Sequence, residues 1–300
     1  MKKLLLAFFA LSLFIPGLTH AAEPPLRIVA SFSILGDMVK QIGGDAVDVR
    51  VLVPVNGDAH TYQPTPDDAK ALAAANIIAI NGLGLESWMD RIIEASGTKA
   101  KLLVASAGVK PRILTKTSTG KEVADPHAWQ DLRNGRLYIR NIASALMAAK
   151  PDEAKKIRER AIAYDNALVK MDDYVKQQFA DIPAAQRKIV TSHDAFGYFG
   201  AAYDVTFLAP VGMSTEDEPS AANVAGLIEQ IKAEGVKQVF IENMTDPRLI
   251  AQIAKDSGAK MGGTLFSDAL SPPDGPAPTY LDMFRNNVPK LREAMLQNGR

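Results

Sequence analysis

The fold of this chain is decided by the stretch EAKKIRERAIAYDNALVKMDDYVKQQF, residues 153–179. It contains no glycine or proline, and its apolar side chains recur at intervals of three or four residues, which places them on one face of a helix. They are Ile157, Ala161, Tyr164, Leu168, Met171, Val175 and Phe179. Counted from Pro151, about 28 residues at 1.5 Å each give roughly 40 Å, more than a strand–helix unit needs. The stretch predicts a stiff helix joining two lobes, with a long packing helix inside one domain as the alternative.

On both sides of this helix, short apolar strands alternate with helical segments. Before it, we expect strands at residues 26–32, 47–55, 76–81 and 100–106, and helices at 34–42, 65–75, 86–96 and 131–149. After it, we expect strands at residues 188–192, 205–209, 236–242 and 259–266, and helices at 221–234, 246–257 and 280–297. Residues 110–123 show no period and are predicted to form a loop. Such alternation is typical of parallel sheets covered by helices on both faces.

The predicted architecture is therefore α/β, with two lobes that each hold a mainly parallel sheet flanked by helices, joined by one long rigid helix. We expect residues 1–22 to be a signal peptide, 23–150 the N-terminal lobe, 151–181 the linking helix and 182–300 the C-terminal lobe. With 300 residues, 47% of them hydrophobic, the chain is long enough for two such lobes with proper cores.

The first 22 residues have the layout of a secretory signal peptide. Lys2 and Lys3 precede a run of 12 residues, 4–15, which is apolar apart from one serine, and small residues precede the expected cut after Ala21 or Ala22. The run is too short for a transmembrane helix, which needs about 20 apolar residues. Loss of both lysines leaves 32 basic and 34 acidic residues, a net charge of −2. We expect a soluble periplasmic protein that does not bind nucleic acid.

The chain has no cysteine, so it has no disulfide and no thiol to carry a lipid anchor. A metal site would have to use His, Asp, Glu and other oxygen donors. Three histidines remain after cleavage, His60, His127 and His193, and each lies in a loop. They are 67 and 66 residues apart, which matches no local zinc motif. A single loop histidine is more often a solvated side chain or a cap, so spacing alone predicts no metal site.

Four longer motifs give more information about the function than the histidine spacing does. They are GDAHTYQPTPDD (57–68), DPHAW (125–129), TSHDAFGYF (191–199) and GGTLFSDALS (262–271). Together they resemble the periplasmic solute-binding proteins of cluster A-I, which deliver zinc or manganese to ABC importers. The resemblance implies two α/β lobes joined by a rigid helix, with the metal between them. It also implies a metal site of His60, His127, His193 and Asp268, a monomer, and an ABC permease at the inner membrane as partner.

Without the resemblance, Asp268 is expected to be a turn or cap residue. With it, three imidazoles and one carboxylate form a donor set suited to Zn²⁺. Many manganese- or iron-linked members carry a glutamate where His193 stands, and a third imidazole favours zinc. Manganese or iron remains the alternative cargo. The segment before the second ligand, residues 114–125, contains no histidine, which argues against a zinc-gathering loop.

Carboxylates near the histidines are candidates to orient the imidazole rings, as metal-ligating histidines require. They are Asp58, Asp125, Asp194 and Glu242. Each of them is equally a candidate cap or solvated charge. Trp129 and Phe199 are expected to pack in the core rather than to wall the site.

Two functions compete on these residues. In the first, the protein is not an enzyme and captures a divalent metal ion, zinc preferred, for delivery to a permease. In the second, three histidines hold a zinc-bound water for hydrolysis, which needs an open coordination position and a general base. The sequence contains no His-Glu-x-x-His pair to favour hydrolysis.

Overall fold

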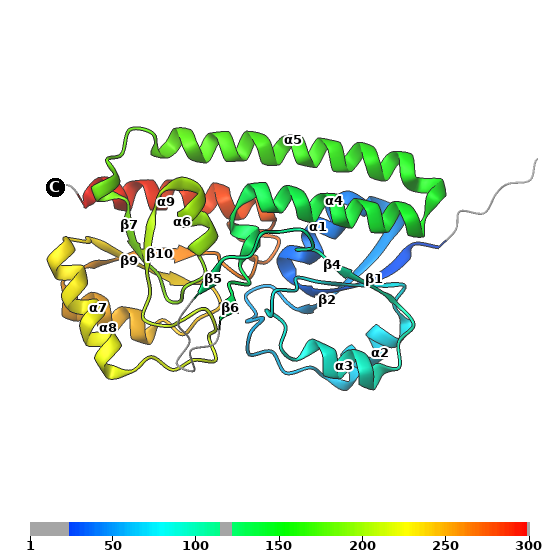
Figure 1. The fold of residues 1–300 in the computed structure, drawn as a ribbon, viewed down its shortest axis with the longest axis horizontal. Coiled ribbons are helices and arrows are strands. Elements are labelled where there is room, and N and C mark those ends of the chain that lie inside the picture. Colours follow the sequence, from blue (N-terminus) through cyan, green and yellow to red (C-terminus); the bar gives the residue numbers. More distant parts are fainter. Residues whose placement is uncertain (1–23, 115–121, 299–300) are drawn as a thin grey trace, which may run out of the picture.

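The computed structural model describes residues 24–114 and 122–298. The predicted signal peptide lies outside these residues, as do residues 115–121 of the segment before His127. Two α/β lobes lie side by side beneath the long helix α5 (Ala154–Phe179), which runs across both of them (Figure 1). The predicted fold class is thus confirmed.

The first lobe is built on a parallel sheet with strand order β2-β1-β3-β4. Its strands are β1 (Leu26–Phe32), β2 (Val47–Val53), β3 (Ile77–Ile80) and β4 (Lys101–Val104). In the central strand β1, every residue from Ile28 to Phe32 is buried, on both faces of the sheet. Such continuous burial is what a sheet covered on both faces requires.

Helices cover both faces of this sheet. They are α1 (Ser33–Gly43), α2 (Pro66–Ala74), α3 (Met89–Ser96) and α4 (Leu132–Ala149), with the 3₁₀ helices η1 (Gly44–Ala46) and η2 (Ala128–Gln130). Helices α1 and α4 lie on the side of α5, and α2 and α3 on the opposite side (Figure 1). Helix α2 begins as predicted, because Thr65 and Asp68 form a capping box around Pro66 at the first helical position.

Two segments differ from the prediction. Helix α3 begins at Met89 rather than at residue 86, because the buried Glu86 carboxylate accepts hydrogen bonds from Ser31 Oγ at 2.6 Å and from the Asn81 backbone N–H at 2.7 Å. These bonds hold Glu86 in an irregular loop. The segment predicted as loop, 110–123, contains a short antiparallel pair, β5 (Ile113–Leu114) with β6 (Val123–Ala124).

The second lobe also has a parallel sheet, with strand order β10-β9-β7-β8. Its strands are β7 (Lys188–Val190), β8 (Thr206–Leu208), β9 (Gln238–Glu242) and β10 (Lys260–Leu265). Its helices are α6 (Gly197–Tyr203), α7 (Ala221–Glu234), α8 (Arg248–Ser257) and α9 (Tyr280–Gln297), with the 3₁₀ helix η4 (Ala184–Gln186). Helix α9 continues through Pro289.

Helix α5 starts after a short 3₁₀ turn, η3 (Pro151–Glu153), and buries the face that the sequence predicts. Its buried residues are Ile157, Leu168, Met171, Val175 and Phe179. It packs against α4 and α1 of the first lobe and against α9 and α6 of the second. Among the described residues, no helix is both long and apolar enough to cross a membrane.

The apolar core is continuous from one lobe to the other. Phe32 and Trp129 of the first lobe belong to the same cluster of buried side chains as Phe199, Phe240 and Phe284 of the second. A separate, smaller cluster lies between the second sheet and helices α7 and α8. Separating the lobes on the α5 side would expose this shared core to water, which is unfavourable. The structure therefore favours small movements between the lobes over a wide opening.

Candidate metal centre

The structure brings the four predicted site residues together between the lobes. His60 lies in the loop between β2 and α2, and His127 lies just before η2, both in the first lobe. His193 follows β7, and Asp268 follows β10, both in the second lobe. One potential ligand atom of each lies within 4.8 Å of the others, and all four side chains are buried. We call these four residues the quartet.

The distances within the quartet suit a single small dication. Asp268 Oδ2 lies 3.1 Å from His193 Nε2, 3.3 Å from His60 Nε2 and 3.5 Å from His127 Nε2. The Nε2 atoms of His60 and His127 are 3.3 Å apart. Zinc bonds of about 2.0–2.1 Å in a tetrahedron place neighbouring donors about 3.3 Å apart.

Asp268 offers a further donor. Its second oxygen, Oδ1, is buried and has no hydrogen-bond partner among the described residues. An unpaired buried carboxylate oxygen is costly unless a cation or a hydrogen bond satisfies it. The quartet therefore offers four donor atoms, or five if Asp268 binds through both oxygens.

His193 is positioned by the ends of neighbouring parallel strands. It forms a parallel bridge with Val211, and its backbone N–H donates to Glu242 Oε1 at 2.9 Å, at the end of β9. The other oxygen of Glu242 lies 2.8 Å from His193 Nδ1, which turns Nε2 toward Asp268. The carboxyl ends of parallel strands thus converge on the site, as is usual in open α/β sheets.

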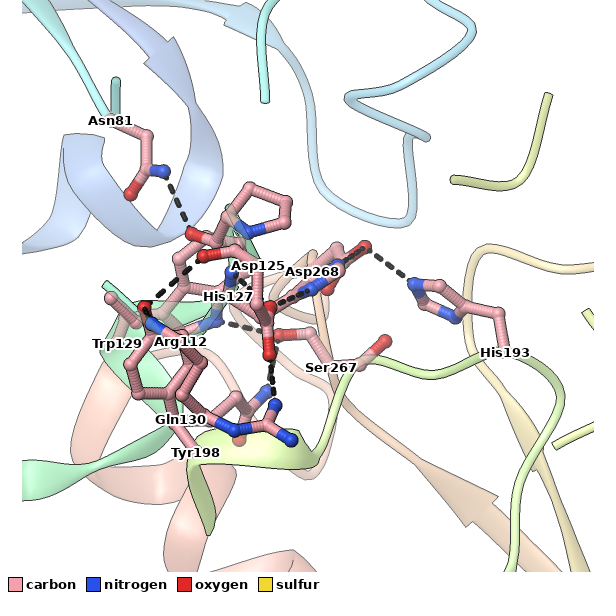
Figure 2. A network of polar contacts seen from close by, with 12 residues as sticks. Asn81, Arg112, Asp125, His127, Trp129, Gln130, His193, Tyr198, Ser267 and Asp268 are labelled. Atoms are coloured by element: carbon pink, nitrogen blue, oxygen red, sulfur yellow. Dashed lines mark hydrogen bonds and ion pairs between the residues drawn. The ribbon is translucent and has the colours of Figure 1, made fainter. Parts of the chain in front are cut away.

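His127 is positioned by Asp125. The Asp125 Oδ1 atom accepts a hydrogen bond from the His127 backbone N–H at 3.0 Å and lies 2.9 Å from Nδ1 of the ring (Figure 2). Asp125 Oδ2 is paired with Arg112. The guanidinium of Arg112 lies over the ring of Tyr198 in the second lobe, 5.6 Å from its centre. The partner that orients His127 is therefore itself held from both lobes.

Asp268 is positioned by the residues that follow His127. The carbonyl oxygen of Ser267 accepts hydrogen bonds from Trp129 Nε1 at 2.9 Å and from Gln130 Nε2 at 2.8 Å (Figure 2). Trp129 is fully buried, as predicted, and its ring also lies 5.4 Å from that of His127. One turn of 3₁₀ helix in the first lobe thereby supports both His127 and Asp268.

Only some of the supporting residues were predictable from the sequence. Of the four carboxylates proposed to orient rings, Asp125 and Glu242 contact an imidazole nitrogen. Asp58 instead accepts from the backbone N–H of His60 at 2.9 Å, and Asp194 has no ring contact among the described residues. Sequence reasoning missed Arg112, Gln130 and Tyr198, because no local pattern marks a residue that meets its partner across a lobe boundary.

The buried charges of the quartet shift one another's pKa values. Burial lowers the pKa of His127, but the carboxylates of Asp268 and Asp125 outweigh it and raise the pKa to about 9. Burial likewise lowers the pKa of His193, and Glu242 and Asp268 raise it well above the usual value. Burial raises the pKa of Asp268, while His127 and His193 hold it well below the usual value. Without a metal ion, protonated imidazoles therefore neutralise the buried carboxylates.

Metal binding is expected to release protons well above pH 6.5, the usual imidazole pKa. The raised pKa of His127, about 9, keeps its ring protonated in the metal-free protein at neutral pH. A metal ion binds only the neutral ring, so affinity should rise with pH from about 6.5 to about 9. Calorimetric titration at pH 7.5 in two buffers of different ionisation enthalpy measures the protons released. The same heat in both buffers would contradict the expectation.

Glu242→Gln is expected to weaken metal binding by about 10- to 100-fold, the usual cost of losing a group that orients a metal-bound imidazole. The amide still accepts from the backbone N–H of His193 but no longer offers a carboxylate to Nδ1. Competition titration with a chelator measures the change. Glu229→Gln, on the surface of α7, is the matched control and should bind like the wild type. Equal affinities for both variants would show that Glu242 does not act through His193.

Comparisons with known proteins identify the family to which the chain is similar. A family model described as "Zinc-uptake complex component A periplasmic" matches residues 28–294. The manganese ABC transporter substrate-binding lipoprotein PsaA of Streptococcus mitis is 33% identical over 282 residues, 92% of this chain and 91% of that protein. The iron ABC transporter substrate-binding lipoprotein MtsA of Streptococcus pyogenes serotype M1 is 32% identical over 93% of this chain and 92% of its own length.

A solved structure of a metal-binding protein is also similar to this chain. The periplasmic zinc-binding protein TroA from Treponema pallidum superposes with a TM-score of 0.85 at 27% identity. The match covers 90% of this chain and 99% of that one. The three relatives are named for manganese, iron and zinc respectively, so similarity alone does not select one ion.

Proposed function

The chain belongs to the ZnuA family of periplasmic metal-binding proteins that serve ABC importers, and on this premise we propose that it captures one Zn²⁺ ion and delivers it to a permease. The ion would be bound by His60, His127, His193 and Asp268. The convergence of these four buried side chains from both lobes is the observation that carries the proposal.

Several features support zinc as the cargo. Three imidazoles with one carboxylate are a common zinc donor set, and the donor spacings of 3.1–3.5 Å around Asp268 Oδ2 suit tetrahedral zinc. Manganese and iron are the alternative, because relatives are named for them and because a fifth donor, Asp268 Oδ1, suits ions that prefer more oxygen ligands.

Elemental analysis of protein purified without a His tag, with competition titration of Zn²⁺ against Mn²⁺, tests the choice of ion. We expect one zinc per chain and tighter binding of Zn²⁺. Retention of manganese or iron by the purified protein, with preferential binding of Mn²⁺, would overturn the zinc assignment but not the transport function.

The site favours holding an ion over hydrolysis. Catalytic zinc usually keeps one position open for water, whereas here four protein donors surround one point. Relatives with a stated role are transport proteins rather than enzymes, and the chain is a binding protein of that kind. Three of the four quartet side chains have no exposed surface, so a bulky substrate has no access to the ion.

We further propose export through the leader at residues 1–22, action in the periplasm as a monomer, and docking on a permease at the inner membrane. Since two ligands come from each lobe, a small displacement between the lobes suffices to break the coordination. Docking would therefore trigger release by shifting one lobe against the other.

A further inference from the structure

A cavity of about 640 Å³ lies between the two lobes next to the quartet. Its walls come from loop 83–87 and from strand β6 with Pro126 in the first lobe, and from loop 210–219 in the second. His60 lines this cavity, and the other three quartet residues do not. His60 is also 5% exposed, whereas His127, His193 and Asp268 are 0% exposed. An ion can therefore reach the quartet by way of His60.

The charge of the cavity suits a cation. Among the described residues that line it there is no lysine or arginine. Four of these residues carry a carboxylate: Asp194, Glu216, Asp217 and Glu218. Glu216, Asp217 and Glu218 are exposed and form no ion pair within the described part of the chain. A cleft lined with one sign of charge raises the local concentration of counter-ions and the rate at which they bind.

His60 is held differently from the other histidines. His127 and His193 each have a carboxylate at Nδ1, whereas no carboxylate of the described residues contacts the second ring nitrogen of His60. Its position depends on its backbone, whose N–H donates to Asp58 Oδ1 at 2.9 Å. His60 is thus the ligand that can leave the ion at the lowest cost.

Asp58 is in turn tied to the opposite lobe. Its other oxygen, Oδ2, accepts a hydrogen bond from Thr215 Oγ1 at 2.7 Å, and Thr215 lies in loop 210–219 between the cavity-lining residues Ser214 and Glu216. This bond crosses from the first lobe to the second beside the cavity. Through Asp58, the bond therefore connects the backbone of His60 with loop 210–219, which lines the cavity.

We infer that the ion enters and leaves through this cavity, past His60, and that the Thr215–Asp58 hydrogen bond is a latch that sets the rate of ion release. The inference rests on the proposed metal-binding function. When the bond is intact, Asp58 holds the loop of His60 against the second lobe. When the bond breaks, Asp58 and His60 can shift, while the start of the loop stays tied to the second lobe through the hydrogen bonds of Asn56 with Leu270 and Asn243.

Release of Zn²⁺ into an excess of fluorescent chelator, followed by stopped flow, tests the latch. Thr215→Val removes the hydroxyl at nearly constant shape and should speed release about tenfold, the cost of one hydrogen bond to a charged group. Thr215→Ser keeps the hydroxyl and should release at the wild-type rate. Thr206→Val, on an exposed position of β8, is the matched control.

Asp58→Ala provides a second arm that does not depend on the folding of the Thr215 variant. If the two side chains act as one latch, the double variant should release no faster than the faster single variant. Wild-type release from Thr215→Val, or effects of the two substitutions that multiply, would overturn the latch. A merely structural role would lower the melting temperature of the metal-free protein and leave the release rate unchanged.

The rate of Zn²⁺ association tests whether the ion enters through the cavity. Neutralising the acidic loop with Glu216→Gln, Asp217→Asn and Glu218→Gln should slow Zn²⁺ association about tenfold at low salt. The control removes the same charge from the outer surface by Asp152→Asn, Glu159→Gln and Asp173→Asn. Equal association rates for both triple variants would exclude the cavity as the route. If wild-type protein binds no ion stoichiometrically, the proposed function fails instead.

Discussion

Replacing Asp268 with alanine is expected to weaken Zn²⁺ binding by about 100-fold to about 1,000-fold. Structural zinc sites contribute about 10–16 kcal/mol of binding free energy, so one ligand of four accounts for roughly 2.5–4 kcal/mol. Asp268 is also the anion at the centre of the quartet, within 3.5 Å of all three imidazoles. Its loss removes the negative charge that offsets the dication, because the carboxylates of Asp125 and Glu242 lie at the Nδ1 atoms of their histidines, on the side of the ring away from Nε2.

Competition titration with a chelator measures this loss. Asp274→Ala is the matched control, because Asp274 is an exposed aspartate in the following turn and should leave the affinity unchanged. If Asp268→Ala kept wild-type affinity and the metal-bound protein hydrolysed esters, the site would be a three-histidine hydrolase centre. The transport assignment of these four residues would then be wrong.

The second large effect is thermal stabilisation by the metal ion. At a free Zn²⁺ concentration of 1,000 Kd, binding to the folded state adds about 4 kcal/mol to the free energy of unfolding. With an unfolding entropy of about 2.1 cal/mol/K for each of roughly 280 residues, that corresponds to a rise in Tm of roughly 7 °C. The two lobes each supply two ligands, so the ion stabilises both lobes together rather than one loop.

Differential scanning fluorimetry with and without the ion measures the shift. His193→Ala should lose most of the stabilisation, since it removes a fully buried ligand whose neighbours are the second-lobe strands. The exposed Thr206→Val variant should keep it. Absence of any shift with both Zn²⁺ and Mn²⁺ would contradict metal binding as the function of the quartet.

Much of the secondary structure was predictable because local interactions decide it. The apolar positions of helix α5 repeat with the helical period, and Thr65, Pro66 and Asp68 mark the start of α2 by capping chemistry. Prediction was wrong near Glu86, where a buried carboxylate binds backbone groups five residues back along the chain. The prediction of a loop at residues 110–123 was also wrong, because β5 and β6 pair residues that lie about ten positions apart in the sequence.

The quartet, unlike these helices and strands, could not be predicted from local sequence patterns. Sequence motifs that resemble a known family pointed to His60, His127, His193 and Asp268, but their spacing predicted nothing. Asp268 by itself fits a turn residue as well as a ligand. Arg112, Gln130, Tyr198 and Thr215, which support the site or its cavity, carried no signal at all.

The sequence by itself determined the alternation of strands and helices and the long helix, because each depends on side chains within a few turns of one another. The tertiary structure alone decided which polar groups meet. The contacts of Asp268 with His193, of Arg112 with Asp125 and of Thr215 with Asp58 join residues that are 75, 13 and 157 positions apart. Of these pairs, Thr215 with Asp58 forms only when both lobes are in place, and Asp268 with His193 forms only when the second sheet is assembled. Buried charges then find partners because leaving them unpaired is costly.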